Sequence, residues 1–277
     1  MGSGIAESVA RAGIQVSAYE PEQGALRRAR ERVEESLTRA VNRSKLDRRV
    51  AADALDRIQF TTSLPDLAEA ELLIEAVVED LEVKRTVFRE LDRVTNPGVI
   101  LASNTSSIPV AELASATNRP DRVLGLHFFS PVPVMELVEV VRALETSDRT
   151  VEAATAFCNR VGKVPILTKD RSGFIVNLLL VPYLVAAVRM HEEGFASREA
   201  IDDCMRLGCG HPMGPLALCD LIGLDVIYAV CNSLYEEFKR AEYAPPPLIK
   251  RMVAAGRLGR KAGRGFYEYA GKAGSAT

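Results

Sequence analysis

Apolar residues in the first 170 positions occur in short runs, and longer charged stretches separate these runs. The charged stretches, such as 22–44 and 81–95, repeat their apolar residues at helical spacing and predict amphipathic helices. The apolar runs have the length of strands and are bounded by turn residues. They lie at 14–19, 58–61, 72–78, 99–103, 123–128 and 137–141. Strands and helices in alternation favour an α/β fold with a parallel, doubly wound sheet.

The pattern changes after a polar, turn-rich segment at 169–173. Beyond it the apolar spacing predicts helices only, so we expect an α/β domain over 1–170 and an all-α domain over 171–277. The longest apolar run, 174–188, is shorter than the roughly 20 residues that a membrane helix needs, so it predicts a buried helix. The amide of Asn177 in this helix needs a hydrogen-bond partner, which a neighbouring helix could supply.

Composition and charge narrow the classes of protein. The net charge of −2 gives no argument for a nucleic-acid partner, and 26% charged residues are ordinary for a globular protein. The five cysteines are an odd number without metal-ligand spacing, which indicates reduced thiols and a cytoplasmic location. We therefore expect no metal site, and neither nucleic acid nor a membrane as a partner.

One stretch, 125–141, predicts a strand, a proline-stiffened turn and a second strand. Glu139 is the one charge within the apolar second strand, and a buried carboxylate needs a partner. His127 ends the first strand, 12 residues earlier, and the turn can bring the two side chains together. A carboxylate on one ring nitrogen orients an imidazole and leaves the other nitrogen free to move a proton. A purely structural pair fits the spacing equally well.

The stretch GLHFFSPVPVMELVEVV resembles the signature of the 3-hydroxyacyl-CoA dehydrogenase family. The similarity runs from Gly2 to about Tyr269, and the short 3-hydroxybutyryl-CoA dehydrogenases are the most similar members. The resemblance implies a Rossmann-like NAD-binding domain followed by an all-α domain that forms a homodimer interface. It also implies that His127 is the catalytic base and that Glu139 orients it.

The resemblance implies an incomplete cofactor-binding unit at the N-terminus. A dinucleotide fold has a strand, the motif G-x-G-x-x-G, a helix, a second strand and an acidic residue about 20 positions on. Gly2 matches the last glycine of this motif, 18 residues before Glu20, while the first strand and first two glycines are absent. We expect Met1 to be an internal methionine and the native product to start upstream. The alternative is a naturally shortened protein.

Other cofactor contacts are implied by the same resemblance. The positions that match the NAD site are Gly2, Glu20, Glu79, Lys84, Ser106, Ser130 and Lys261. Glu20 favours NAD over NADP, because a carboxylate accepts the ribose hydroxyls and repels a 2′-phosphate. Ser130 stands where the family usually has asparagine, so part of a cofactor contact is expected to be lost or taken over by water.

The resemblance also implies substrate contacts. Ser36 and Arg43 would meet the CoA end; they are seven residues apart and so are expected on one helix face, although an exposed face would look the same. Ser106 lies in a polar cluster just past a strand, which is either a turn or a site. By resemblance Ser106 and Asn177 hold the reacting oxygen beside His127.

The implied reaction is the reversible, NAD-linked oxidation of a short-chain (S)-3-hydroxyacyl-CoA to the 3-oxoacyl-CoA, as in fatty-acid β-oxidation. One alternative is a dehydrogenase of a small hydroxy acid or sugar acid. Another is a truncated, non-catalytic paralogue. The implied catalytic set argues against the latter, because all four members are present: His127, Glu139, Ser106 and Asn177.

Overall fold

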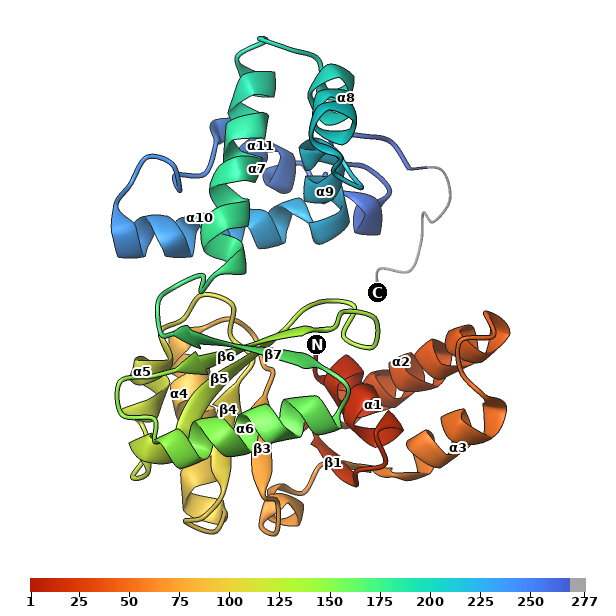
Figure 1. Ribbon diagram of the computed structural model, residues 1–277, viewed down its shortest axis with the longest axis vertical. Helices are drawn as coiled ribbons and strands as arrows, with labels where there is room; N and C mark the ends of the chain where they lie inside the picture. The colour runs from red at the N-terminus through yellow and green to blue at the C-terminus, as the bar shows by residue number, and fades with distance from the viewer. Residues whose placement is uncertain (270–277) are drawn as a thin grey trace. The chain divides into compact units, whose positions relative to one another are not determined.

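The computed structural model describes residues 1–269 and divides into two compact units, Met1–Arg171 and a second that begins at Ser172 (Figure 1). Every described strand lies in the first unit, and the second is built from helices. An α/β Rossmann-like unit followed by an all-α unit is the fold class that the sequence predicts. The last part of the predicted helical domain, 270–277, lies outside the described residues.

The first unit alternates strands and helices as the hydrophobic pattern predicts. Its strands are β1 (Val16–Tyr19), β2 (Ile58–Thr61), β3 (Leu72–Glu75), β4 (Ile100–Ser103), β5 (Val123–Phe128), β6 (Leu137–Arg142) and β7 (Val164–Lys169). Its helices are α1 (Gly2–Arg11), α2 (Gln23–Asn42), α3 (Arg48–Asp56), α4 (Leu81–Val94), α5 (Val110–Ala114) and α6 (Asp148–Arg160), with 3₁₀ turns at Leu64–Leu67 and Pro120–Arg122.

Most strand pairs are parallel, and one is not. The order β3-β4-β5-β6-β7 forms one sheet, in which only β5 and β6 run antiparallel. The antiparallel pair is the strand–turn–strand stretch that the sequence predicts at 125–141. The turn between β5 and β6 explains the difference, because it is too short for the crossover that a parallel pair requires.

The strands β1 and β2 form a separate parallel pair, without a ladder to β3 among the described residues. This interruption falls where the sequence leads us to expect a further strand. Helix α1 joins the two pieces, because Ile5 and Val9 pack in one apolar cluster with Val16 of β1 and with Leu72 and Ile74 of β3. The same cluster includes residues of α6, so α1 and α6 cover one face of the sheet (Figure 1).

The third strand is shorter than its apolar run. It ends at Glu75, whose side-chain oxygen accepts the backbone N–H of Val77 at 2.6 Å. This side-chain bond takes the place of a ladder bond, so the backbone leaves the sheet. Helix α4 then starts with Asp80, whose carboxylate accepts the N–H of Val83 at 3.0 Å and caps the helix. Glu79 lies in the short turn between the side-chain bond of Glu75 and the helix cap of Asp80.

The second unit packs its helices around one apolar core. They are α7 (Val176–Glu192), α8 (Arg198–Cys209), α9 (Pro215–Ile222), α10 (Leu224–Phe238) and α11 (Pro247–Ala254), followed by a 3₁₀ turn at Arg260–Ala262. The Gly- and Pro-rich stretch 207–215 has the composition of a loop and predicts one, but α8 continues through Gly208 to Cys209, so this prediction is partly wrong. The helix ends at Gly210, which has the left-handed φ of 69° that glycine adopts without strain.

A buried carboxylate holds the glycine-rich C-terminal signature, residues 259–267, in place. Asp220 of α9 is 1% exposed and accepts the backbone N–H groups of Phe266 and Tyr267, each at 2.9 Å, and the Tyr269 hydroxyl at 3.0 Å. Gly265 lets the backbone come this close, since a Cβ there would lie 1.9 Å from a carboxylate oxygen of Asp220. The tail therefore belongs to the core of the helical unit.

Within residues 1–269, no single helix is long and apolar enough to cross a membrane; α9 and α10 meet that test only as a pair bent by 97°. The same residues contain no group of three or more His, Cys, Asp or Glu side chains that could hold a metal ion. Burial raises the pKa of the Cys158 and Cys231 thiols to about 12, so these two cysteines are unreactive packing residues.

Candidate active site

The predicted contact between His127 and Glu139 is present. The two residues are direct partners in the antiparallel β5–β6 register, which places their side chains on the same face of the sheet. The imidazole Nδ1 lies 2.7 Å from Glu139 Oε2, and the glutamate side chain is 1% exposed. The Phe129 ring packs on the imidazole with centroids 4.4 Å apart. A carboxylate and an aromatic ring thus fix the orientation of the imidazole.

A second cluster forms where β3 and β4 end. Glu79, after β3, uses one oxygen to accept the N–H groups of Ser106 at 2.8 Å and Ser107 at 3.1 Å, and the Thr105 hydroxyl at 2.7 Å. The three residues follow β4, so the glutamate gathers the turn 26–28 positions further along the chain. The carboxyl ends of strands in such sheets are where ligands bind. Ser106 therefore lies at the ligand-binding edge of the sheet, on a turn whose N–H groups the Glu79 carboxylate holds in place.

The turn that carries Ser106 is also tied to the strand that carries His127. Asn104 donates its backbone N–H to the Glu75 carbonyl at 2.8 Å, and its side-chain oxygen accepts the N–H of Phe128 at 2.8 Å. One asparagine thus links the ends of β3, β4 and β5. In the polar cluster after β4, Asn104 therefore has a structural role, whereas Ser106 remains the candidate for contact with a ligand.

Glu79 is held in its charged form. Burial alone would raise the pKa of this carboxyl, but the Lys84 ammonium and the donors from Thr105 and Ser106 outweigh burial and lower the pKa below its ordinary value. A carboxyl with a lowered folded-state pKa stabilises the fold above its unfolded pKa, and this stabilisation is lost as the pH falls through the folded value.

We therefore expect Glu79→Gln to reduce the free energy of unfolding at pH 7. The deficit relative to the unmodified chain should shrink as the pH falls below the ordinary glutamate pKa of about 4.3. Urea unfolding between pH 3 and pH 8 measures this. Glu82→Gln, on the exposed side of α4 with a side chain 69% exposed, is the matched control and should show almost no deficit. A pH-independent deficit in the Glu79 variant would contradict this electrostatic account.

Lys84, expected to line the cofactor site, is a buried side chain. It is 1% exposed, and its Nζ lies 2.7 Å from Glu75 and 3.3 Å from Glu79. Glu75 is equally buried and also accepts the Ser103 hydroxyl at 2.7 Å. In the sequence, Glu75 is the one charge within the apolar run 72–78. That isolated charge was itself the available signal, because a charge inside a buried strand requires a partner.

The residues around β1 fit one end of a dinucleotide. Glu20 directly follows β1, at the carboxyl end of a parallel strand. Gly2 is the first residue of α1, which has no side-chain cap and so leaves first-turn N–H groups available to an anion. A Cβ at Gly2 would lie 3.7 Å from that of Ala76, so packing within the chain does not itself require glycine there. This donor and acceptor set suits NAD.

The two expected CoA contacts differ in environment. Ser36, on α2, is half-buried, and its hydroxyl hydrogen-bonds the carboxyl of Glu7 in α1. Arg43 is exposed, one residue beyond the end of α2, so the predicted common helix face stops just short of it. Ser36 therefore has a packing role of its own, whereas Arg43 keeps its guanidinium in solvent.

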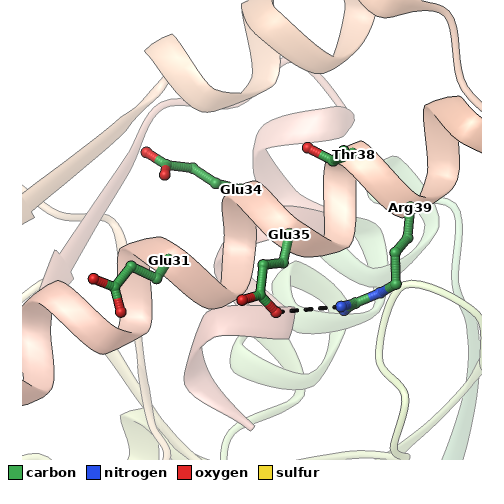
Figure 2. Close-up of a pocket in the computed structure, with 5 residues that line it drawn as sticks. All are labelled: Glu31, Glu34, Glu35, Thr38 and Arg39. Carbon is green, nitrogen blue, oxygen red and sulfur yellow. Dashed lines mark hydrogen bonds and ion pairs between the residues drawn. The ribbon is translucent and has the colours of Figure 1, made fainter.

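Figure 2 shows a shallow hollow on the outer side of α2. It is lined by Glu31, Glu34, Glu35, Thr38 and Arg39. Each glutamate of the lining pairs with an arginine of the same helix: Glu35 with Arg39 at 3.3 Å, Glu34 with Arg30 at 2.8 Å and Glu31 with Arg27 at 4.0 Å. This part of α2 is therefore a solvated helix face.

Three further expected site residues lie in loops or in the second unit. Ser130 is exposed and follows β5 by two residues. Asn177 stands in the first turn of α7, where its backbone N–H donates to the Gly173 carbonyl at 3.1 Å. Lys261 pairs with Asp225, at the start of α10, with 2.6 Å between the ammonium and a carboxylate oxygen. Their roles toward a cofactor or substrate stay predictions.

Comparisons with known proteins agree with the order of the two units. The family model described as 3-hydroxyacyl-CoA dehydrogenase, NAD binding domain, matches residues 1–171, and the C-terminal domain of that family matches residues 173–269. A 3-hydroxybutyryl-CoA dehydrogenase of Mycobacterium tuberculosis is 53% identical over 97% of this chain and 95% of that protein. The crystal structure of (S)-3-hydroxybutyryl-CoA dehydrogenase from Ralstonia eutropha superposes with a TM-score of 0.92 at 45% identity, covering 98% of this chain and 96% of that one.

Proposed function

This chain belongs to the 3-hydroxyacyl-CoA dehydrogenase family, the NAD-dependent enzymes that oxidise 3-hydroxyacyl-CoA, and we propose that its own substrate is short-chain (S)-3-hydroxybutyryl-CoA. The names of relatives at 44–53% identity support this choice of chain length. The observation that carries the catalytic assignment is the 2.7 Å contact between His127 and Glu139.

His127 is the proton-transferring group in this proposal. Its Nδ1 faces Glu139, and Nε2 is the nitrogen that we assign to take the proton of the substrate's 3-hydroxyl group. The carboxylate then faces the imidazolium that this transfer creates and stabilises it electrostatically. When bound, NAD supplies the hydride acceptor for C3. In the reverse direction His127 returns the proton to the oxygen of the 3-oxo group.

Two neutral side chains complete the proposed set. Ser106 is half-buried on a turn held by Glu79, and its hydroxyl donates to Glu79 at 3.2 Å; in the proposal this hydroxyl donates to the reacting oxygen instead when substrate binds. We extend the same role to Asn177 from the resemblance alone. Fixing the oxygen near the base converts binding energy into rate by proximity and orientation.

The remaining assignments concern the cofactor, the CoA end of the substrate, and the location and assembly of the protein. Glu20 favours NAD over NADP, because its carboxylate would repel a 2′-phosphate. Gly2, Glu79 and Ser130 are proposed to lie along the cofactor, with Lys261, and Arg43 is proposed to meet the phosphates of CoA. A cytoplasmic homodimer acting in fatty-acid β-oxidation completes the proposal.

The first experiment is NADH oxidation driven by acetoacetyl-CoA, followed by NAD reduction with (S)-3-hydroxybutyryl-CoA. We expect turnover in both directions, little with NADPH, and little with the (R) substrate or with free acetoacetate. Free 3-hydroxybutyrate and a sugar acid test the rival substrate class, which turnover with them alone would support. Failure with every CoA thioester, also by a chain extended at its N-terminus with a strand and a glycine turn, would refute the proposal.

A further inference from the structure

A buried carboxylate has no part in the proposed reaction. Glu75 ends β3 with its side chain 1% exposed. One of its oxygens accepts the N–H of Val77 at 2.6 Å and the Lys84 ammonium at 2.7 Å, and the other accepts the Ser103 hydroxyl at 2.7 Å. Both oxygens are therefore engaged inside the protein, and the carboxylate is not available to a ligand.

The cation beside it is equally inaccessible. Lys84 lies in the first turn of α4 with its side chain 1% exposed, and its ammonium stands between Glu75 and Glu79 at 2.7 and 3.3 Å. A side chain with this burial acts on a ligand only through the groups that it touches. Of the two carboxylates, Glu79 is the one that reaches the surface, with its side chain 35% exposed.

Glu79 connects the buried pair of Glu75 and Lys84 to the turn after β4. The oxygen of Glu79 that does not face Lys84 accepts the N–H groups of Ser106 and Ser107 and the hydroxyl of Thr105. The turn therefore has its backbone amides aimed at one fixed point. The position of that point is set by Lys84, and the position of Lys84 is set by Glu75.

The burial of this ion pair is the reason to look for a role beyond stability. Replacing a buried ion pair by apolar residues of similar volume is often neutral or stabilising, because desolvation offsets the attraction. A fold that needed only stability could pack an apolar pair between β3 and α4. A charged pair can instead fix the place of a third charged group, because its field and hydrogen bonds are directional.

We propose that Glu75 and Lys84 are positioning residues, which hold Glu79 in place and through it orient Ser106. The inference rests on the proposed function for the claim that Ser106 touches substrate. It assigns Lys84 an indirect role in place of a direct contact with the cofactor. It also makes Glu75 a determinant of the site, although Glu75 reaches neither ligand.

The test is a double-mutant cycle on the full chain with Glu75→Gln, Lys84→Met and the two combined. Glu75→Gln leaves the buried Lys84 ammonium with Glu79 as its one carboxylate, and Lys84→Met leaves the buried Glu75 carboxylate without its cation, so each single variant should unfold more easily. The double variant removes both charges and should recover most of the stability. The double variant lacks the ammonium beside Glu79, however, so it should not restore the ordered conformation of the turn after β4. Two readouts are needed, kcat and KM for acetoacetyl-CoA, and amide hydrogen exchange at Ser106 and Ser107.

In the double variant we expect kcat to fall at least tenfold and the Ser106 and Ser107 amides to exchange at least tenfold faster. The Leu124 amide in β5 should exchange as before. Recovery of stability together with kcat and with protected turn amides would show that the pair is merely structural, and would overturn the proposal. Arg89→Met, which removes an exposed cation from the same helix, is the control and should change neither readout.

A variant that keeps both charges covers the case in which the double variant fails to fold. Glu75→Asp shortens the side chain by one methylene, so the Ser106 and Ser107 amides should exchange faster while the β5 amides stay protected from exchange. Unchanged turn exchange in this variant would refute the proposal. The exchange readout needs no substrate, so a chain without dehydrogenase activity but with the expected exchange would refute the proposed function and leave the positioning role standing.

Discussion

His127→Gln is expected to lower kcat for acetoacetyl-CoA reduction by about 10²–10⁴-fold, the contribution typical of a positioned general acid or base. Glutamine keeps a polar group of similar size beside Glu139, but it cannot carry the proton. NADH affinity should stay nearly intact, because the imidazole is proposed to act on the substrate's oxygen. Steady-state kinetics and NADH fluorescence titration measure the two effects separately.

The chain offers a matched control for this substitution. His211 is exposed in the turn after α8, and His211→Gln should leave kcat within about twofold of the unmodified enzyme, as expected for a surface change. Glu139→Gln is informative as well, since it removes the charge that faces the imidazolium and should lower kcat less than loss of the imidazole does. Full activity in His127→Gln would remove the histidine from the mechanism.

Asp220→Ala is expected to lower the free energy of unfolding of the helical unit by about 3–5 kcal/mol. The substitution leaves the buried N–H of Phe266, the partly buried N–H of Tyr267 and the partly buried Tyr269 hydroxyl without their acceptor, and an unsatisfied buried group costs about 1–3 kcal/mol. Urea unfolding followed by circular dichroism measures the loss. The turn that carries Lys261 lies in the same C-terminal signature, so it should exchange its amides faster in this variant.

Asp203→Ala provides the comparison for this loss. Asp203 lies on α8, where its side chain is 56% exposed and pairs with Arg206 at 2.8 Å. An exposed pair of this kind contributes less than about 1 kcal/mol, so the control should unfold almost as the unmodified chain does. Equal stability of both aspartate variants would show that the carboxylate of Asp220 does not anchor the tail.

The pattern of apolar runs was sufficient for the elements and the fold class. The strand β5 has the predicted ends, and α4 begins at the predicted residue and ends one residue before the predicted end. These elements are long or strongly periodic, so local propensity and burial agree. Errors occurred where a single side chain decides the boundary, as at Glu75, which ends β3 early, and at Gly210, which ends α8 late.

The sequence by itself also determined the pairing of His127 with Glu139, because a short turn leaves few registers and each register fixes which side chains face each other. Tertiary structure alone decided the contacts between positions distant in the chain. The contacts of Glu79 with the turn after β4 and of Asp220 with the C-terminal signature and Tyr269 join residues 26–49 positions apart. Such contacts depend on how strands and helices stack, and no local spacing encodes that arrangement.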